Sequence, residues 1–180
     1  MDPQNQSPPP SYPPPAAGNP KVKQLAIVMI VLGVLVAAGA FTKSWMSASE
    51  RGASIGFGLT GAEACGRGQC MSISYGDMGS KVPADVKIFG WLGFLGGLAA
   101  AAGAVALGVF ALTNKPNPIP PKVLNGVFGV AAAGMAGFLV RMLLEAEKGI
   151  GISYSPFLGL GGLIGVGVVA KMLEKERAGG

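Results

Sequence analysis

Two cysteines are the side chains of this chain with the clearest chemical potential. Cys65 and Cys70 bracket the segment Gly66-Arg67-Gly68-Gln69 and are the only cysteines in the 180 residues. The two glycines permit the tight turn that a short disulfide-closed loop requires. The segment lies in a polar stretch that we expect outside the cell, where oxidising conditions preserve disulfides. We therefore predict a structural disulfide, of modest entropic value because the loop is short.

One charged side chain is embedded in an apolar run. Arg141 stands near the end of such a run, and Glu145 follows one helical turn later. An ionisable group inside a membrane segment is by default a functional candidate, here a gate or an anion site. An ion pair between positions i and i+4 of a helix is the simpler interpretation. We favour this structural anchor, and a small pore or transporter subunit using Arg141 stays open as an alternative.

Other site chemistry has little support in the sequence. The chain has no histidine, which removes the commonest general base and metal ligand, and two cysteines alone cannot build a four-ligand metal site. We expect no enzyme activity, and we predict no catalytic residue, metal or cofactor. A membrane thiol oxidoreductase is the weaker alternative, because a thiol relay needs a second cysteine pair.

The apolar runs that must position these residues dominate the chain. Half of the residues are hydrophobic and only 13% are charged, whereas soluble domains carry about 25% charged residues. Four runs reach the roughly 20 apolar residues that a transmembrane helix needs. Between the first two runs, alternating stretches such as Ser54–Phe57 and Met71–Tyr75 indicate short strands. The predicted fold is an all-α membrane protein, a four-transmembrane-helix bundle with a small antiparallel β-sheet in its first outer loop.

The predicted boundaries follow the polar and proline-rich segments. The four spans are placed at 24–42, 87–113, 122–144 and 155–173, the outer loops at 43–86 and 145–154, a Pro-rich inner loop at 114–121, and cytoplasmic tails at 1–23 and 174–180. Seven basic residues close to span ends share the side of both termini, and six are spread over the other side. By the positive-inside rule both termini are cytoplasmic, in a plasma or bacterial inner membrane.

The N-terminal tail holds eight of the fourteen prolines. Such a composition predicts a disordered tail with polyproline II character. Pro9, Pro10 and Tyr12 match a P-P-x-Y ligand for a proline-motif-binding partner, although a solvated low-complexity tail is the simpler interpretation. A cleaved secretory signal at 21–40 is a weaker alternative for the first run.

Small residues recur every fourth position along three of the predicted helices. They are Gly96, Ala100, Ala104 and Gly108, then Gly129, Ala133 and Gly137, then Gly161 and Gly165. Residues four apart share a helix face, and small ones let two backbones approach closely. We expect these faces to pack within the bundle, with a contact to another subunit as the sharper hypothesis. The expected partners are the lipid bilayer and a second copy or a membrane complex. Nucleic acid is not expected, because no basic patch is interleaved with aromatic residues.

The outer loops resemble those of the claudin-type four-span family. The residues that carry the resemblance are Trp45, Gly58, Leu59, Cys65 and Cys70 in the first outer loop and Tyr154 and Pro156 in the second. The family motif has a tryptophan after the Gly-Leu pair, where this chain has Thr60. The resemblance implies that these residues are scaffold and that the outer loops contact neighbouring molecules or cells. The function expected from the sequence is therefore non-enzymatic, of a structural, scaffolding or adhesion type.

Overall fold

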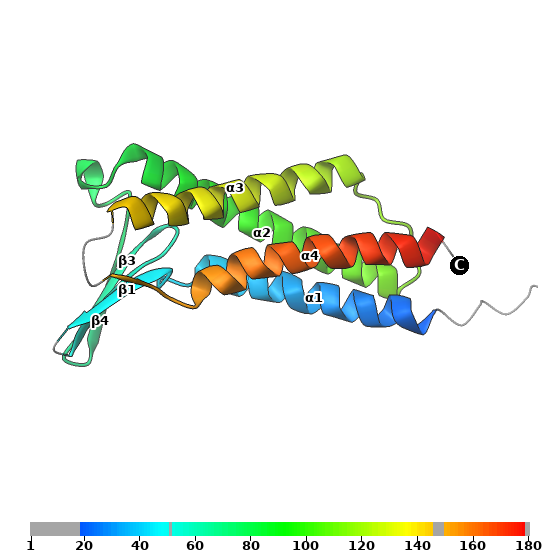
Figure 1. Cartoon of the computed structure of the whole chain (residues 1–180), viewed down its shortest axis with the longest axis horizontal. Helices are drawn as coiled ribbons and strands as arrows, with labels where there is room; N and C mark the ends of the chain where they lie inside the picture. The colour runs from blue at the N-terminus through cyan, green and yellow to red at the C-terminus, as the bar shows by residue number, and fades with distance from the viewer. Residues whose placement is uncertain (1–18, 51, 146–149, 179–180) are drawn as a thin grey trace, which may run out of the picture.

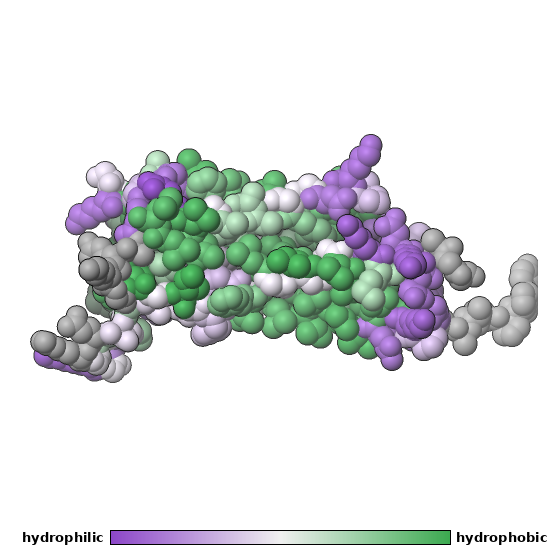
Figure 2. Space-filling view, in the orientation of Figure 1, coloured by the Kyte–Doolittle hydropathy of each residue, from purple (hydrophilic) through white to green (hydrophobic). Residues whose placement is uncertain are grey.

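Four long helices form the body of the protein (Figure 1). The computed structural model describes residues 19–50, 52–145 and 150–178. Within these, α1 (Pro20–Phe41), α2 (Ala84–Leu112), α3 (Pro121–Glu145) and α4 (Ser155–Ala178) are each long and apolar enough to cross a membrane. Figure 2 shows the hydrophobic residues as a broad middle zone, with hydrophilic residues gathered at the ends. The predicted four-helix membrane fold is confirmed, and the protein is a multi-pass membrane protein.

The helices pack as neighbours in the order α3, α2, α1, α4. Helix α1 packs along both α2 and α4, and α2 packs along α3, whereas α3 and α4 share few contacts. Helices α2 and α3 are joined by the short connection 113–120, which favours antiparallel packing of that pair, whereas α1 contacts α2 and α4 across long separations in the sequence. The bundle therefore depends on three helix pairs rather than on a closed ring of four.

A five-stranded antiparallel sheet stands at one end of the bundle (Figure 1). Its strands are β1 (Met46–Glu50), β2 (Ala53–Phe57), β3 (Gly61–Gly66), β4 (Gln69–Ser74) and β5 (Gly151–Ile152), in the order β4-β3-β2-β1-β5. The small sheet predicted between the first two helices is confirmed, and β5 adds a strand from the segment before α4. We call this end of the molecule the sheet end and the opposite end, where α1 begins, the terminal end.

The two faces of the sheet differ in chemistry, because successive side chains of a strand point to opposite sides. Residues that are directly opposite each other on neighbouring strands share a face. One face, the apolar face, carries the rows Met46–Phe57–Ala62–Ile73 and Ala48–Ile55–Ala64–Met71. The other, the serine face, carries the rows Ser47–Gly56–Glu63–Ser72 and Ser49–Ser54–Cys65–Cys70.

An aromatic core joins the sheet to the helices. Trp45 is fully buried at the start of the sheet, and its ring stands edge-on to Phe138 of α3 with centroids 6.0 Å apart. Its Nε1 donates a hydrogen bond of 2.7 Å to the carbonyl of Gly39 in α1. The buried Tyr75 lies against the same Phe138 ring and donates its hydroxyl to the carbonyl of Gly58 at 2.8 Å. These contacts fix the sheet against α1 and α3 without any charged group.

Candidate functional site

The β3–β4 hairpin presents the two cysteines opposite each other. Cys65 and Cys70 form a disulfide, with Cα atoms 4.1 Å apart. The turn between them has two central residues, Arg67 and Gly68, both with positive φ (51° and 81°). Such a pair is typical of the type I′ turn that closes two-residue hairpins. The predicted disulfide is thus present, and it closes a hairpin whose turn chemistry already sets the register.

The ladder pattern explains why the cysteines lie so close. The amide of Tyr75 donates to the carbonyl of Thr60, which marks that opposed pair as hydrogen-bonded. Because the two kinds of pair alternate along an antiparallel ladder, Cys65 and Cys70 form a non-hydrogen-bonded pair. In such pairs the Cα atoms lie about 4.5 Å apart, closer than in the hydrogen-bonded kind. The backbone alone therefore brings the two sulfur atoms together.

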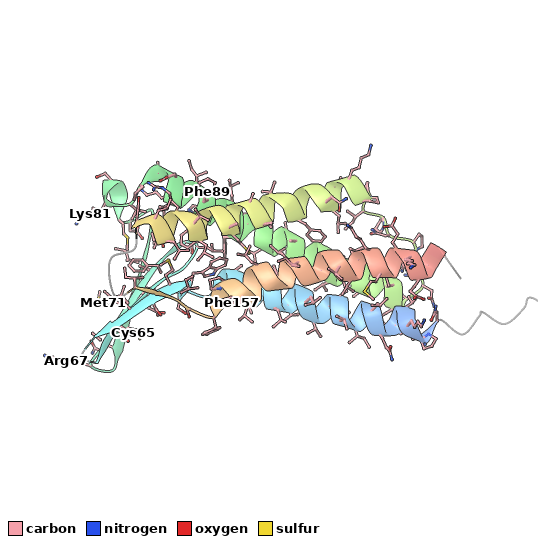
Figure 3. All side chains as sticks on the ribbon, viewed as in Figure 1. Cys65, Arg67, Met71, Lys81, Phe89 and Phe157 are labelled. Atoms are coloured by element: carbon pink, nitrogen blue, oxygen red, sulfur yellow. A yellow bond between two sulfur atoms is a disulfide. The ribbon has the colours of Figure 1, made fainter. Side chains whose placement is uncertain are left out.

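A carboxylate lies beside the disulfide on the serine face. Glu63 is two residues before Cys65 on β3, so both side chains point the same way. One carboxylate oxygen and the two sulfur atoms all lie within 4.8 Å of one another. A shallow concavity of about 530 Å³ opens over Cys65, Cys70 and Ser54. Figure 3 shows Cys65 and Arg67 near the free tip of the sheet, away from the helices.

The scaffold residues of the resemblance occupy different environments. Trp45 and Leu59 are buried, as is Pro156 at the start of α4, whereas Tyr154 is 63% exposed. A Cβ at Gly58 would lie 2.7 Å from both the Cα of Lys43 and the carbonyl oxygen of Thr42. Only glycine fits at that position without moving the backbone that enters β1.

Arg141 is held between two carboxylates at the sheet end of the bundle. Its Nε donates to Asp85 at the start of α2, and an Nη lies 2.7 Å from Glu145 on its own helix. The sequence indicated Glu145 but missed Asp85, which is 56 positions earlier. Asp85 lies just before the second predicted span and Arg141 near the end of the third, so antiparallel packing of these spans was the available signal. The arrangement links α2 to α3 and compensates the arginine charge.

The predicted small-residue faces divide into packed and outward-facing members. Ala100 and Ala104 are buried, and a Cβ at Gly96 would lie 2.9 Å from the Cα of Ala131 in α3. A Cβ at Gly108 would meet the carbonyl of Ala26 in α1 at 2.7 Å. The α2 face is therefore the interior packing face that the sequence predicted.

On α3 and α4 the expected interior face is partly wrong. A Cβ at Gly129 or at Gly161 would meet no atom within 4 Å, and Ala133 is exposed. Gly137 does pack, because a Cβ there would lie 2.7 Å from the Phe89 ring, and Gly165 packs on Leu32. The close approaches that the repeat missed are those of Gly134 and Gly162. Since both lipid and core faces of these helices are apolar, the sequence repeat cannot fix which face points inward.

Two shallow apolar grooves run along the outside of the bundle. One of about 660 Å³ lies between α1 and α2, and one of about 470 Å³ lies between α2 and α3. A smaller cavity of about 190 Å³ lies under the apolar face of the sheet and includes Tyr75, Lys81 and Met142. None of these three is lined by a set of groups arranged for acid–base or nucleophilic catalysis.

One sequence motif remains to be placed. Pro9, Pro10 and Tyr12 lie outside the residues that the structure describes. No protein-family model matches the chain, and comparison with curated proteins gives no match.

Proposed function

We propose that this protein is a non-enzymatic structural membrane protein that associates with further copies of itself through its sheet, in a scaffolding or adhesion-type role. The observation that carries the proposal is the free edge of the sheet at β4. Every residue of β4 is exposed, and Met71 and Ile73 on the apolar face are 80% and 45% exposed. With Ile55 on β2, also 44% exposed, they form an apolar patch beside the outer backbone groups of β4, which pair with no other strand in the described part of the chain.

Soluble sheet edges are normally protected by charge, proline or a bulge. Residues 69–74, Gln-Cys-Met-Ser-Ile-Ser, contain neither a charge nor a proline. An exposed edge of this kind favours pairing with another strand. We take a second copy of the same chain as the partner, because neighbouring copies in one bilayer have the same orientation and can form a symmetric contact.

The resemblance to claudin-type proteins and the cytoplasmic termini belong to the same proposal. In favour of the resemblance are the four spans, the sheet at one end, the buried Trp45 and the disulfide between Cys65 and Cys70. In favour of the orientation are the basic residues of the terminal end, which are Lys21, Lys23, Lys115, Lys122, Lys171, Lys175 and Arg177. The plasma membrane or a bacterial inner membrane is the expected location.

A matched pair of substitutions tests self-association. We expect Met71→Lys to reduce the oligomer fraction of the detergent-purified protein in light scattering coupled to gel filtration. Ser54→Lys places the same charge on the serine face of the inner strand β2, away from the edge, and leaves the apolar patch intact. Aggregation of proteoliposomes then separates contact between membranes from contact within one membrane. A wild-type protein that stays monomeric at bilayer-like protein densities would contradict the proposal.

Labelling in intact cells tests the orientation. A membrane-impermeant maleimide should react with Cys65 and Cys70 only after treatment with an impermeant reductant. Labelling that requires cell lysis but no reductant would put the sheet in the cytoplasm and refute the orientation and the resemblance together.

The pore alternative has a separate test. Asp85 and Glu145 both bind the guanidinium of Arg141, which supports an anchor rather than a gate. Ion flux in proteoliposomes that is present in wild type and lost in Arg141→Gln would favour the pore instead.

A further inference from the structure

We propose that the Cys65–Cys70 hairpin, once its disulfide is reduced, is a binding site for a thiophilic divalent cation such as Zn²⁺, with Glu63 as the third protein ligand. The inference concerns the serine face of the sheet and does not rest on the proposed self-association, although Cys70 belongs to the edge strand β4 that both proposals use. Its basis is the grouping of two sulfur atoms and one carboxylate oxygen within 4.8 Å of one another.

The ligand types suit such a cation. Thiolate sulfur binds Zn²⁺ at about 2.3 Å and carboxylate oxygen binds it at about 2.0–2.2 Å. Two sulfur bonds of about 2.3 Å at a tetrahedral angle place the sulfur atoms roughly 3.8 Å apart. In the oxidised hairpin the two sulfur atoms are bonded to each other, and one Glu63 oxygen lies within 4.8 Å of both. Reduction lets the sulfur atoms separate to the spacing that one ion needs, and rotation of the Glu63 side chain brings its oxygen onto the same ion.

The backbone keeps the two cysteines opposed when the covalent bond is gone. They form a non-hydrogen-bonded pair with Cα atoms 4.1 Å apart, and the type I′ turn at Arg67 and Gly68 sets this register. Strand β3 is also paired along its length with β2, so the hairpin is part of a larger sheet. Reduction therefore leaves a preorganised dithiol rather than two separate thiols.

The site is open on the side where an ion would enter. The concavity of about 530 Å³ is lined by both cysteines and by Ser54, the residue opposite Cys65 on β2. Glu63 lies outside this lining and approaches the sulfur atoms from the next row of the serine face. Three protein ligands leave one tetrahedral position for water, and a hydroxyl next to the sulfur row can hydrogen-bond that water. The sequence excluded a four-cysteine site, and the structure supplies a carboxylate in place of the missing cysteines.

Reduction and binding are balanced steps. Two external thiol molecules give up one electron and one proton each to the Cys65–Cys70 bond and leave as their own disulfide. The cation then displaces one proton from each cysteine thiol, and the two protons pass to solvent. The oxidised hairpin has no thiolate to offer, so binding is confined to the reduced state.

The test uses full-length protein in detergent, reduced with a phosphine, which becomes the phosphine oxide by taking oxygen from water. Titration with Cd²⁺ should produce a sulfur-to-metal charge-transfer band that saturates at one ion per chain in reduced wild type and is absent from oxidised wild type. Glu63→Gln should weaken binding at least tenfold. Asp77→Asn, a second carboxylate of the same sheet-end segment that bonds Ser74 instead, should bind as wild type does.

Three results would overturn the proposal. They are no saturating band in the reduced protein, one ion shared by two chains, or equal affinity in Glu63→Gln and wild type. If Glu63→Gln does not fold, Co²⁺ in reduced wild type gives an independent answer. Strong visible bands of four-coordinate cobalt with sulfur ligands support the site, and weak bands of six-coordinate cobalt refute it.

Discussion

Gly134 on α3 makes the tightest backbone contact between α2 and α3, and Gly134→Ala is expected to destabilise the protein. A Cβ there would meet the backbone nitrogen of Gly93 and would lie 2.7 Å from the carbonyl carbon of Leu92 and 2.8 Å from the Cα of Gly93. All three atoms are backbone, so no side chain can rotate away. Ordinary contact begins at 3.4 Å, so the two helices must separate by at least about 0.7 Å to clear the carbonyl carbon of Leu92, and by more to clear the nitrogen of Gly93.

The magnitude follows from two opposing effects. Overpacking a tight interior costs about 1–3 kcal/mol, and this site lies at the upper end because only helix movement relieves the clash. Replacing glycine by alanine in a helix stabilises the folded state by up to about 1 kcal/mol, because alanine has the higher helix propensity. We expect a net loss of about 1–2 kcal/mol in the free energy of unfolding. Gly129→Ala on the same helix gains the same helix propensity without a steric clash, because a Cβ there would have no neighbouring atom within 4 Å.

Denaturation in mixed micelles, followed by tryptophan fluorescence, measures both variants, since Trp45 is buried in the folded state. The expected difference between Gly134→Ala and Gly129→Ala is about 2–3 kcal/mol. Equal stabilities for the two variants would show that α2 and α3 do not cross at Gly134, and the reasoning from the glycine contacts would fail.

Four further substitutions probe the sheet end. Tyr75→Phe leaves the carbonyl of Gly58 without its buried partner and should cost about 1–3 kcal/mol in chemical denaturation. Burial raises the pKa of the Tyr75 phenol above its usual range, so wild type should lose stability above about pH 10 and Tyr75→Phe should lose this dependence. Ser155→Ala removes a buried hydroxyl that has no hydrogen-bond partner among the described residues and should leave the melting temperature unchanged or raised. Asp85→Asn and Arg141→Gln should each lower the melting temperature slightly, because the pair is partly exposed, and their double mutant should be no worse than either one.

The helices, the presence of a small sheet and the two strands β2 and β4 could be predicted because each depends on local composition. A run of about 20 apolar residues forms a helix in lipid, because only a helix satisfies its backbone hydrogen bonds within the run. Short stretches that alternate apolar and polar residues between glycines favour strands. Helix α1 begins at Pro20, before the expected start at residue 24, because Asn19 accepts a hydrogen bond from the amide of Lys21 and proline suits the first helical turn. Strand β5 has only two residues, and its pairing with β1 is a tertiary contact that no local sequence pattern predicts.

The rotation of each helix about its axis could not be predicted. In a soluble bundle the polar face marks the outside, but here lipid-facing and interior faces are equally apolar. Glycine and alanine are so frequent that a repeat of four exists in more than one phase, as the choice of Gly161 over Gly162 shows. Asp85 was missed for the related reason that its partnership with Arg141 depends on how α2 and α3 are rotated.

The contacts that hold the sheet on the bundle lie far from the disulfide. A Cβ at Gly90 in α2 would overlap the carbonyl group of Leu59, and the indole of Trp45 binds the carbonyl of Gly39. These backbone contacts fix the inner rows of the sheet. The Cys65–Cys70 bond closes only a two-residue turn at the opposite end of β3, where the type I′ geometry already holds the chain. Breaking that bond therefore costs the fold little, and a cysteine pair whose bond is dispensable for folding can change its oxidation state or bind a cation while the sheet remains intact.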